Sequence, residues 1–312
     1  MAGVFDSEID AWLAAYPAPD IDYSDVESVR ALTARYMAEH GGPAARWPRD
    51  DVQMESIEIG GVQALMWRPR DAADPVPVVL AFHGGAFIVG SPLGAERIAV
   101  PLAAEHDICT VSVAYPLAPE HRAPVARDAA RAVLDAIHGL PGIEAERVAV
   151  HGSSAGASLA AGLALHARDI GVGLALQSLS CPALDSRSPH SADPSHSMRG
   201  LSPTLTRRSV VAMWEHYLGG QQAHSPELRY AVPALAEDLR GVAPAHITVA
   251  EYDVLRDEAL HYARRLGEAG VPVEVDLVVG TVHGFDGLLT DSRVARTAID
   301  RQVSALATAL RS

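Results

Sequence analysis

The chain of 312 residues contains no lysine, and all 25 of its basic residues are arginine. Schiff-base chemistry, lysine-bound pyridoxal phosphate and the Walker phosphate-binding loop each depend on a lysine ammonium, so this absence excludes all three. The 39 acidic residues outnumber the basic ones and give a net charge of −14 at pH 7. Because such a charge repels phosphate backbones and anionic membranes, we expect no nucleic-acid partner.

Cysteines and long hydrophobic runs are also scarce. The two cysteines, Cys109 and Cys181, form no CxxC pair, which favours two buried, reduced thiols. No uninterrupted apolar run approaches the ~18 residues of a membrane span. The first residues carry acidic side chains where a signal peptide needs basic ones. These features predict a cytoplasmic protein without a membrane span.

From Pro75 onward, β-branched hydrophobic runs alternate with amphipathic segments of helical periodicity. The predicted strands are Val76–Phe82, Cys109–Val113, Val148–His151, Gly173–Leu179, His246–Ala250 and Val273–Val279. The clearest predicted helices are Ala123–His138, Ala155–Arg168, Asp257–Ala269 and Ser292–Leu310. A hairpin formed by Gln53–Ile59 and Val62–Arg68 precedes them. This pattern predicts an α/β fold with a mostly parallel central sheet flanked by helices.

One segment interrupts the alternation. Residues 186–203 are rich in serine, proline and histidine, and an amphipathic stretch, Leu205–Leu218, follows them. An insertion of this size after a strand is more often a lid or cap than an idle loop. We therefore expect a cap over one end of the sheet.

The segment Gly152-Ser153-Ser154-Ala155-Gly156 follows a predicted strand and opens a predicted helix. In a nucleophile elbow, a sharp strand-to-helix turn lifts the central serine hydroxyl out of the sheet, and small neighbours let the helix pack closely. The GxSxG pattern alone is weak because it recurs by chance. Its position between a strand and a helix makes Ser154 the candidate nucleophile.

A second motif, His83-Gly84-Gly85-Ala86, begins where the predicted strand Val76–Phe82 ends. Glycines leave backbone N–H groups unobstructed, so this loop can point two donors at a developing oxyanion. A third donor is expected from the residue after the nucleophile, at the helix N-terminus. The alternative is an ordinary tight turn, but both motifs follow a strand, which favours an oxyanion hole.

A serine nucleophile needs a base and an orienting carboxylate. Among the 14 histidines, His283 is favoured as the base because it follows the last hydrophobic strand. His151 is next to the elbow and is expected in the core, and His261 is expected on a helix face.

Asp253 is the favoured acid, because it follows the predicted strand His246–Ala250 at the edge where catalytic loops gather. Asp257 and Glu258 compete with it, although both more naturally open the following helix. The resulting chain order of serine, aspartate and histidine is that of the α/β hydrolases.

Five blocks of this sequence resemble the hormone-sensitive-lipase-like carboxylesterases (bacterial family IV), in the order and spacing of that family. They are AFHGGAFIVGS (81–91), AYPLAPEHRAP (114–124), HGSSAGASLA (151–160), AEYDVLRDEALHYARRL (250–266) and VHGF (282–285). The resemblance covers roughly residues 75–300 and implies an α/β-hydrolase fold with a helical cap. It implies a catalytic triad of Ser154, Asp253 and His283, and an oxyanion hole made by the N–H groups of Gly84, Gly85 and Ala155.

The resemblance also implies a division of the chain. The cap corresponds to residues 1–45 and 186–222, and the catalytic core to residues 46–185 and 223–312. Two departures from the family concern the site: Ala86 stands where a third glycine is usual, and Ser153 stands where the family has Asp or Thr. The first departure is expected to narrow the acyl entrance.

The predicted substrate contacts are Ala86, Phe87, Trp214 and Tyr217. Phe87 has a competing interpretation as a core residue behind the loop. Trp214 and Tyr217 either wall the acyl pocket or form the face through which the cap docks. The core interpretation of Phe87 is favoured, whereas the sequence does not choose between the two alternatives for Trp214 and Tyr217.

The sequence thus predicts a serine carboxylesterase that hydrolyses short- to medium-chain acyl esters through an acyl-enzyme. No cofactor is expected, and no metal, because the histidines at 190, 196 and 224 lack ligand spacing. An amidase or deacetylase acting on an acylated small molecule is the alternative enzyme. A non-catalytic ligand receptor on the same fold is disfavoured by the retained His283. A homodimer is compatible with the sequence.

Overall fold

The computed structural model describes residues 4–16, 21–40, 49–73, 75–190 and 202–311. Its strands form one 8-stranded sheet in the order β1-β2-β4-β3-β5-β6-β7-β8. β2 runs antiparallel to both of its neighbours, and all the other pairs are parallel. The strands are β1 (Val52–Ile59), β2 (Val62–Pro69), β3 (Val76–Phe82), β4 (Cys109–Val113), β5 (Ile143–Ser153), β6 (Gln177–Ser180), β7 (Ala245–Tyr252) and β8 (Val273–Val282). The predicted mostly parallel sheet is confirmed.

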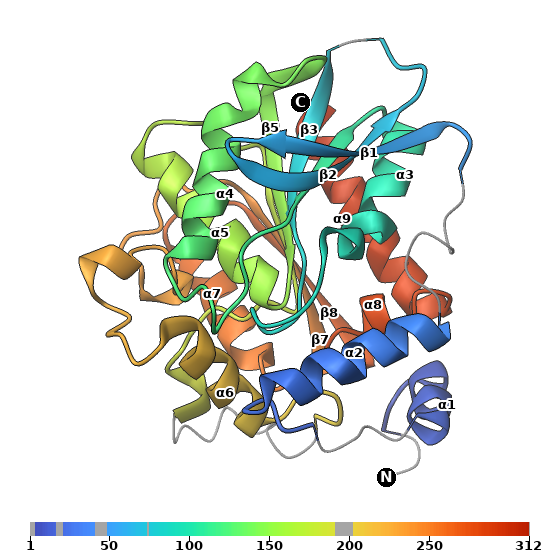
Figure 1. Ribbon diagram of the computed structural model, residues 1–312, viewed down its shortest axis with the longest axis vertical. Coiled ribbons are helices and arrows are strands. Elements are labelled where there is room, and N and C mark those ends of the chain that lie inside the picture. Colours follow the sequence, from blue (N-terminus) through green and yellow to red (C-terminus); the bar gives the residue numbers. More distant parts are fainter. Residues whose placement is uncertain (1–3, 17–20, 41–48, 74, 191–201, 312) are drawn as a thin grey trace.

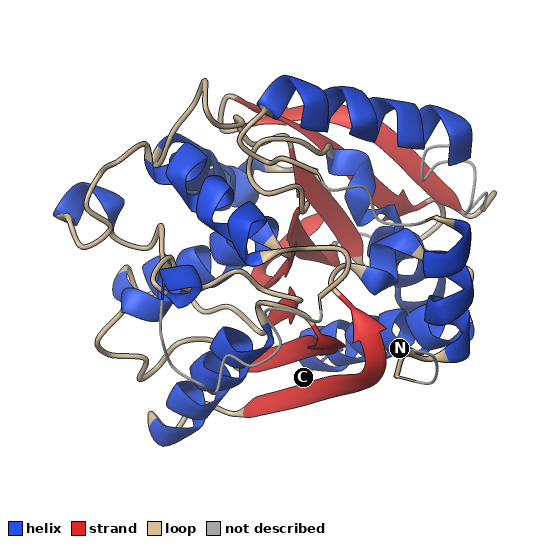
Figure 2. Cartoon of the chain, turned by 90° about the horizontal axis from the view of Figure 1, so that it is seen from below, coloured by secondary structure: helices blue, strands red, loops and turns tan. Residues whose placement is uncertain are grey.

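Helices cover both faces of the sheet (Figure 1). One face carries α3 (Glu96–His106) and α9 (Arg293–Arg311). The opposite face carries α4 (Val125–Ala136), α5 (Ala155–Asp169) and α7 (Arg256–Glu268). Figure 2 shows the twisted sheet running between these layers. The layers bury the sheet on both sides, as a parallel sheet requires.

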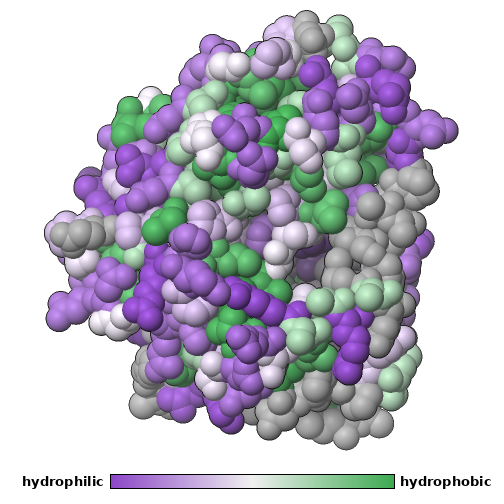
Figure 3. Space-filling model, in the orientation of Figure 1, coloured by the Kyte–Doolittle hydropathy of each residue, from purple (hydrophilic) through white to green (hydrophobic). Residues whose placement is uncertain are grey.

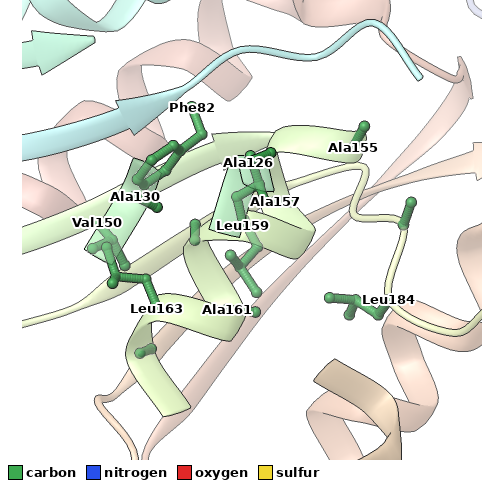
Figure 4. Packing of buried hydrophobic residues seen from close by; sticks show 14 of the residues in the cluster. Phe82, Ala126, Ala130, Val150, Ala155, Ala157, Leu159, Ala161, Leu163 and Leu184 are labelled. Carbon is green, nitrogen blue, oxygen red and sulfur yellow. The ribbon is translucent and has the colours of Figure 1, made fainter. Parts of the chain in front are cut away.

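Alternation along β3 divides the core between the two faces. Leu80 and Phe82 belong to the larger cluster on the α5 side, whereas Val79 packs with Ile98 of α3 and Ile299 of α9. The small side chains of α5 let this helix lie close to the strands, as Figure 4 shows. Burial of these apolar side chains stabilises the layered arrangement and holds the strand ends in place.

Three helices lie together at one end of the molecule, at the bottom of Figure 1: α1 (Ser7–Ala15), α2 (Val26–His40) and α6 (Arg207–Leu218). They meet the ends of the parallel strands and the loops that follow them. The amide of Asp6, the N-cap of α1, donates to Gly280 O near the end of β8, and Arg30 Nε of α2 donates to Ile88 O after β3. Tyr217 O of α6 accepts the amide of Ala123. Parts of the predicted cap segments, residues 1–3, 17–20, 41–45 and 191–201, lie outside the described residues. The division into cap and core remains a prediction.

Some element boundaries differ from the sequence prediction. β8 continues past the predicted end at Val279 and ends at Val282. Gly280 has a φ of 74° within the strand, and its N–H donates to the Glu251 carboxylate, so the strand is irregular at this residue but does not end there. His283 therefore follows the strand directly. The helix predicted from Ala123 begins at Val125, after Pro124, whose missing amide hydrogen suits a helix start.

The predicted strand Gly173–Leu179 begins only at Gln177 as β6. Its first residues connect α5 to the sheet, where Leu174 and Leu176 are buried. Leu176 O already accepts the Val150 amide of β5, but regular strand pairing begins only at Gln177. A continuous apolar run indicates burial, but it does not by itself distinguish a strand from a buried connection.

Candidate active site

Ser154 occupies the sharp turn between β5 and α5, with φ 53° and ψ −118°. A non-glycine residue in this region is strained and needs support from its surroundings. A Cβ on Gly152 would lie 2.3 Å from Gly156 O, and a Cβ on Gly156 would lie 2.2 Å from Phe82 O. Glycine is therefore required at both positions so that the helix can start against the end of β3.

The hydroxyl of Ser154 lies next to His283, which lies next to Asp253. Ser154 Oγ is 2.9 Å from His283 Nε2, and His283 Nδ1 is 2.7 Å from Asp253 Oδ2. Asp253 is 1% exposed, and its other oxygen accepts the Leu255 amide at 2.9 Å. The structure thus brings the three residues singled out in the sequence into one continuous hydrogen-bonded chain.

The environment of His283 favours its protonated form. Burial opposes protonation, but the charge and hydrogen bond of Asp253 and the charge of Asp286 outweigh it, so the pKa of His283 is raised. In the neutral imidazole, Nδ1–H donates to Asp253 and leaves Nε2 to accept the Ser154 proton. This arrangement suits a general base whose cation is stabilised once it has taken that proton.

Gly84 lies against the nucleophile elbow, and Ala155 follows Ser154 in the chain. A Cβ on Gly84 would be 3.1 Å from Ser153 O and 3.4 Å from Ser154 Cβ, so the loop passes against the elbow. Among the described residues, neither the N–H of Gly84 nor that of Gly85 donates a backbone hydrogen bond. Ala155 is the first residue of α5, where the amide has no partner within the helix. That the three amides bind a developing oxyanion stays a prediction.

His83 supports this loop from behind. Its Nδ1 is 2.7 Å from Gly84 O, its ring stacks on Tyr115 at 4.2 Å, and the Tyr115 hydroxyl donates to His83 O at 2.7 Å. Burial lowers the pKa of His83 to about 4, so the ring stays neutral. A Cβ on Gly90 would fall 2.4 Å from His83 Nδ1, so glycine is required there as well.

The competing candidates lie elsewhere. His151 is buried in β5, where its Nδ1 is 3.2 Å from Ser178 Oγ, and His261 is on α7. Asp257 pairs with the neighbouring Arg256, and Glu258 accepts the Leu184 amide. Among the described residues, none of these forms a hydrogen bond with the Ser154 side chain, so the geometry favours His283 and Asp253.

Cys181 lies behind this group. Its Sγ and the ligand atoms of Asp253 and His283 all lie within 4.8 Å of one another. Burial raises the pKa of the Cys181 thiol well above its usual value, and the charge of Asp253 adds to this effect. Both cysteines are buried and free of disulfides, as predicted. The thiol is a neutral neighbour of the triad.

Comparisons with known proteins bear on the family. A family model described as an alpha/beta hydrolase fold matches residues 79–287. The chain is 37% identical to "Esterase LipI" of Mycobacterium tuberculosis over 250 residues, which cover 78% of this chain and 76% of the relative. It is 33% identical to "Carboxylesterase NlhH" of the same species over 302 residues, with 93% and 92% covered. The chain belongs to the hormone-sensitive-lipase-like carboxylesterases of the α/β-hydrolase superfamily.

Solved structures agree with this assignment. This carboxylesterase chain superposes on a "Bacterial Heroin Esterase" with a TM-score of 0.89, 33% identity and 99% of each chain covered. A Pyrobaculum calidifontis esterase gives a TM-score of 0.84 at 30% identity, covering 97% of this chain and 98% of that one. The protein is a carboxylic ester hydrolase, and its substrates are small-molecule esters. None of the helices in the described ranges combines the length and apolar character needed to cross a membrane.

The predicted substrate contacts form an aromatic cluster beside the oxyanion loop. Phe87 stacks on Tyr217 with ring centroids 3.8 Å apart, and Trp214 lies 5.7 Å from Phe87. Ala86 is 6% exposed, and the three rings are at most 3% exposed. These side chains pack α6 against the loop that follows β3. That they also contact substrate stays a prediction.

Three residues around the site have structural roles that the sequence did not predict. Arg30 of α2 donates to Ile88 O and Ala118 O and forms a two-hydrogen-bond pair with Glu120. Glu258 and Asp286 are buried carboxylates; the sequence suggested Glu258 only as an alternative catalytic acid and gave no role to Asp286. Their partners are distant in the sequence, so only the folded structure brings them together.

Proposed function

We propose that this protein hydrolyses short- to medium-chain acyl esters, with Ser154 as the nucleophile, His283 as the base and Asp253 as the orienting acid. The observation that carries the proposal is the continuous contact from Ser154 Oγ through His283 to the buried Asp253 carboxylate. This geometry is that of nucleophile, base and orienting group in serine hydrolases.

In the first half of the reaction, Ser154 Oγ attacks the ester carbonyl carbon while His283 Nε2 takes its proton. Asp253 stabilises the imidazolium, and the N–H groups of Gly84, Gly85 and Ala155 bind the oxyanion. Collapse of the tetrahedral intermediate breaks the ester C–O bond, and the alcohol leaves with the proton from His283. Water then attacks the acyl-enzyme, its proton passes to His283, and the second collapse releases the acid and restores Ser154.

We expect the aromatic cluster of Phe87, Trp214 and Tyr217 to limit the depth of an acyl pocket beside the loop that follows β3. The expected range of acyl-chain lengths follows from this limit. Each methylene buried in a pocket contributes ~0.8 kcal/mol until the pocket is full. On the face shown in Figure 3, hydrophobic residues are interrupted by hydrophilic ones, whereas a lipase that acts on lipid droplets presents a broad apolar surface.

A panel of p-nitrophenyl esters of graded acyl length, with matched anilides, tests this function. EDTA is present throughout, because the proposed mechanism uses no metal. We expect rates to peak at short to medium length and to fall steeply for palmitate, with the anilides slower than the esters. Equal or faster hydrolysis of emulsified long-chain triglycerides would contradict the chain-length proposal, and faster anilide hydrolysis would favour an amidase.

We also propose a cytoplasmic location and a homodimer formed through β8. Two buried free cysteines fit a reducing compartment. Among the described strands, β8 lies at the edge of the sheet and pairs with β7 alone. Its Val275, Leu277 and Val279 are 37%, 45% and 71% exposed. Two copies related by a twofold axis can pair these edges antiparallel and cover the apolar row. Light scattering should give a dimer mass, and a Leu277→Lys variant should give a monomer; a monomeric native protein would exclude this interface.

A further inference from the structure

Asp286 is a second carboxylate buried close to the active site, and the mechanism above does not use it. It is the second residue of α8 (Phe285–Leu288) and is 1% exposed. Its Oδ2 accepts the Ser180 hydroxyl at 2.7 Å and the Gln302 amide at 3.3 Å, and Arg97 Nη2 lies 3.5 Å away. One carboxylate thus ties α8 to β6, α9 and α3.

Two of these partners lead directly to the reacting groups. The carbonyl oxygen of Ser180 accepts the amide of Ser154 at 2.8 Å, so the residue held by Asp286 also holds the strained backbone of the nucleophile. Arg97 Nη1 donates to Gly94 O at 2.7 Å, in the turn that follows the oxyanion loop. Asp286 therefore lies beneath both the elbow and the segment after the loop.

The charge of Asp286 reaches the imidazole. Burial raises the pKa of Asp286, but Arg97, Ser180, Gln302 and His151 together outweigh it and leave that pKa lowered, so the carboxylate is ionised. This negative charge favours the protonated form of His283, in addition to the larger contribution of Asp253.

The other ionisable groups around this pair do not supply a competing negative charge. Cys181, which follows β6, keeps its proton because burial raises the pKa of its thiol. His151, in β5, is neutral because burial lowers its pKa to about 3. Arg97, from α3, is cationic and partly offsets Asp286. The field that stabilises the imidazolium of His283 therefore comes from Asp253 and Asp286.

We propose that Asp286 is a positioning residue for ester hydrolysis: it fixes Ser180 beneath the nucleophile and places a second negative charge behind the imidazole of His283. This inference rests on the proposed function of Ser154, His283 and Asp253. It assigns to one side chain a geometric role, acting through Ser180, and an electrostatic role, acting on His283. The two roles can be measured separately.

Three substitutions separate them. Asp286→Asn keeps the shape and removes the charge, Ser180→Ala removes the hydrogen bond and keeps the charge, and Asp276→Asn is the matched control. Asp276 is a mostly buried carboxylate on β8 that binds His246 and Arg301. The titration of His283 is followed by NMR on protein whose histidines are labelled at Cε1. The His283 signal is the one that is missing in His283→Gln. The pH profile of kcat/KM is measured on the same variants.

In Asp286→Asn, the pKa of His283 and the acidic limb of kcat/KM should both move down by about 0.5–1 pH unit, and the plateau of kcat should fall about 3- to 10-fold. Ser180→Ala should lower the plateau and leave the limb in place. Asp276→Asn should change neither. An Asp286→Asn variant whose His283 titrates as in the native protein, or shifts no more than in Asp276→Asn, would overturn the inference.

If Asp286→Asn does not fold, Arg97→Gln provides a second test. Arg97 contributes most to keeping the buried Asp286 carboxylate ionised. Without Arg97, the charge of Asp286 is either less offset, which raises the pKa of His283, or lost through protonation of Asp286, which lowers it; an unchanged pKa of His283 would overturn the inference. The NMR titration does not depend on turnover. A native protein that hydrolyses no ester would refute the proposed function, whereas an active protein with an unshifted Asp286→Asn would refute the role of Asp286 alone.

Discussion

Ser154 carries its hydroxyl on a backbone with a φ of 53°, and the strain is supported by hydrogen bonds on both sides of the turn. Its amide donates to Ser180 O, and its carbonyl accepts the amides of Ala157 and Ala183. These contacts hold the residue where the hydroxyl meets His283. Ser153, the preceding residue, still belongs to β5 and pairs with Ser180. Adjacent serines therefore have different roles in the turn.

The protonation of His283 sets the pH dependence of the reaction. Burial lowers the pKa of His283, but Asp253 and Asp286 raise it by more. The pKa of His283 is therefore above its ordinary value of 6.5. An imidazolium cannot accept the Ser154 proton, so activity is lost as the pH falls through this pKa and is regained as it rises.

We therefore expect kcat/KM for a p-nitrophenyl ester to rise along a single limb whose midpoint is above pH 6.5 and then to level off. Initial rates between pH 5 and 9, with protein stability checked at each pH, measure it. A flat profile across this range would contradict histidine as the base.

At the scale of elements, the close contact between α5 and the end of β3 depends on Gly156. A Cβ at this position would lie 2.2 Å from Phe82 O and 2.4 Å from His83 O, and neither backbone atom can move without shifting the oxyanion loop. We expect Gly156→Ala to destabilise the fold by more than about 2 kcal/mol and to abolish most activity.

Gly173→Ala is the matched control, because nothing lies within 4 Å of a Cβ at Gly173. Urea unfolding and ester hydrolysis of both variants are the measurements. Similar effects of the two substitutions would show that the close approach at Gly156 is not what matters.

Helix α2 is joined to the core through Arg30. Its guanidinium donates to Ile88 O at 2.9 Å and to Ala118 O at 3.1 Å, and it pairs with Glu120 at 2.7 Å. Ile88 belongs to the turn that begins at Gly85, since its amide donates to Gly85 O. The position of the helix is thereby coupled to the oxyanion loop.

Arg30→Ala should therefore lower kcat/KM about tenfold, because a loosened loop binds the oxyanion less well. Arg208→Ala is the comparison. Arg208 of α6 forms an exposed ion pair with Asp22, which precedes α2, and exposed ion pairs contribute little to stability. Steady-state kinetics on one short-chain ester compare them. An equal decrease of kcat/KM in the two variants would argue against a specific role for Arg30.

At the scale of the whole molecule, Glu258 links the pH to stability. It is buried on α7, where it accepts the amides of Leu184 and Asp185, and burial raises its pKa to about 8. Between its ordinary pKa near 4.5 and this value, the folded state holds a proton that the unfolded state has lost. Stability should therefore decrease as the pH rises across this window.

Glu258→Gln should remove part of this decrease, because the amide oxygen can still accept the two N–H groups without ionising. Thermal unfolding of the native protein and the variant from pH 5 to 8 measures the effect. A native protein whose melting temperature falls no more steeply than that of the variant would contradict this role.

The sequence predicted the parts of the site that depend on local patterns. Motifs in which a turn follows a strand predicted that Ser154 and Gly84 lie just after strand ends. The alternation of hydrophobic runs predicted the strand that precedes His283. Ser180 and Asp286 are separated by 106 residues and Arg30 and Glu120 by 90. Glu120 and Asp286 lie in or next to blocks of the family pattern, but no pattern indicates their partners. Such contacts depend on how the layers pack, and a single sequence contains no local signal for that.

The central claim, that Ser154 is the nucleophile, is tested most directly by covalent labelling. A fluorophosphonate forms a stable bond only with an activated serine. Trypsin cleaves after Arg147 and Arg168, so one peptide, Val148–Arg168, carries Ser153, Ser154 and Ser158, and fragmentation distinguishes them.

We predict one equivalent of label, on Ser154, incorporated in proportion to the loss of esterase activity. Ser154→Ala should take up no label and should lose roughly 10⁴- to 10⁶-fold in kcat. Ser153→Ala should still be labelled and active. Full labelling at another serine, or substantial turnover by Ser154→Ala, would contradict the account.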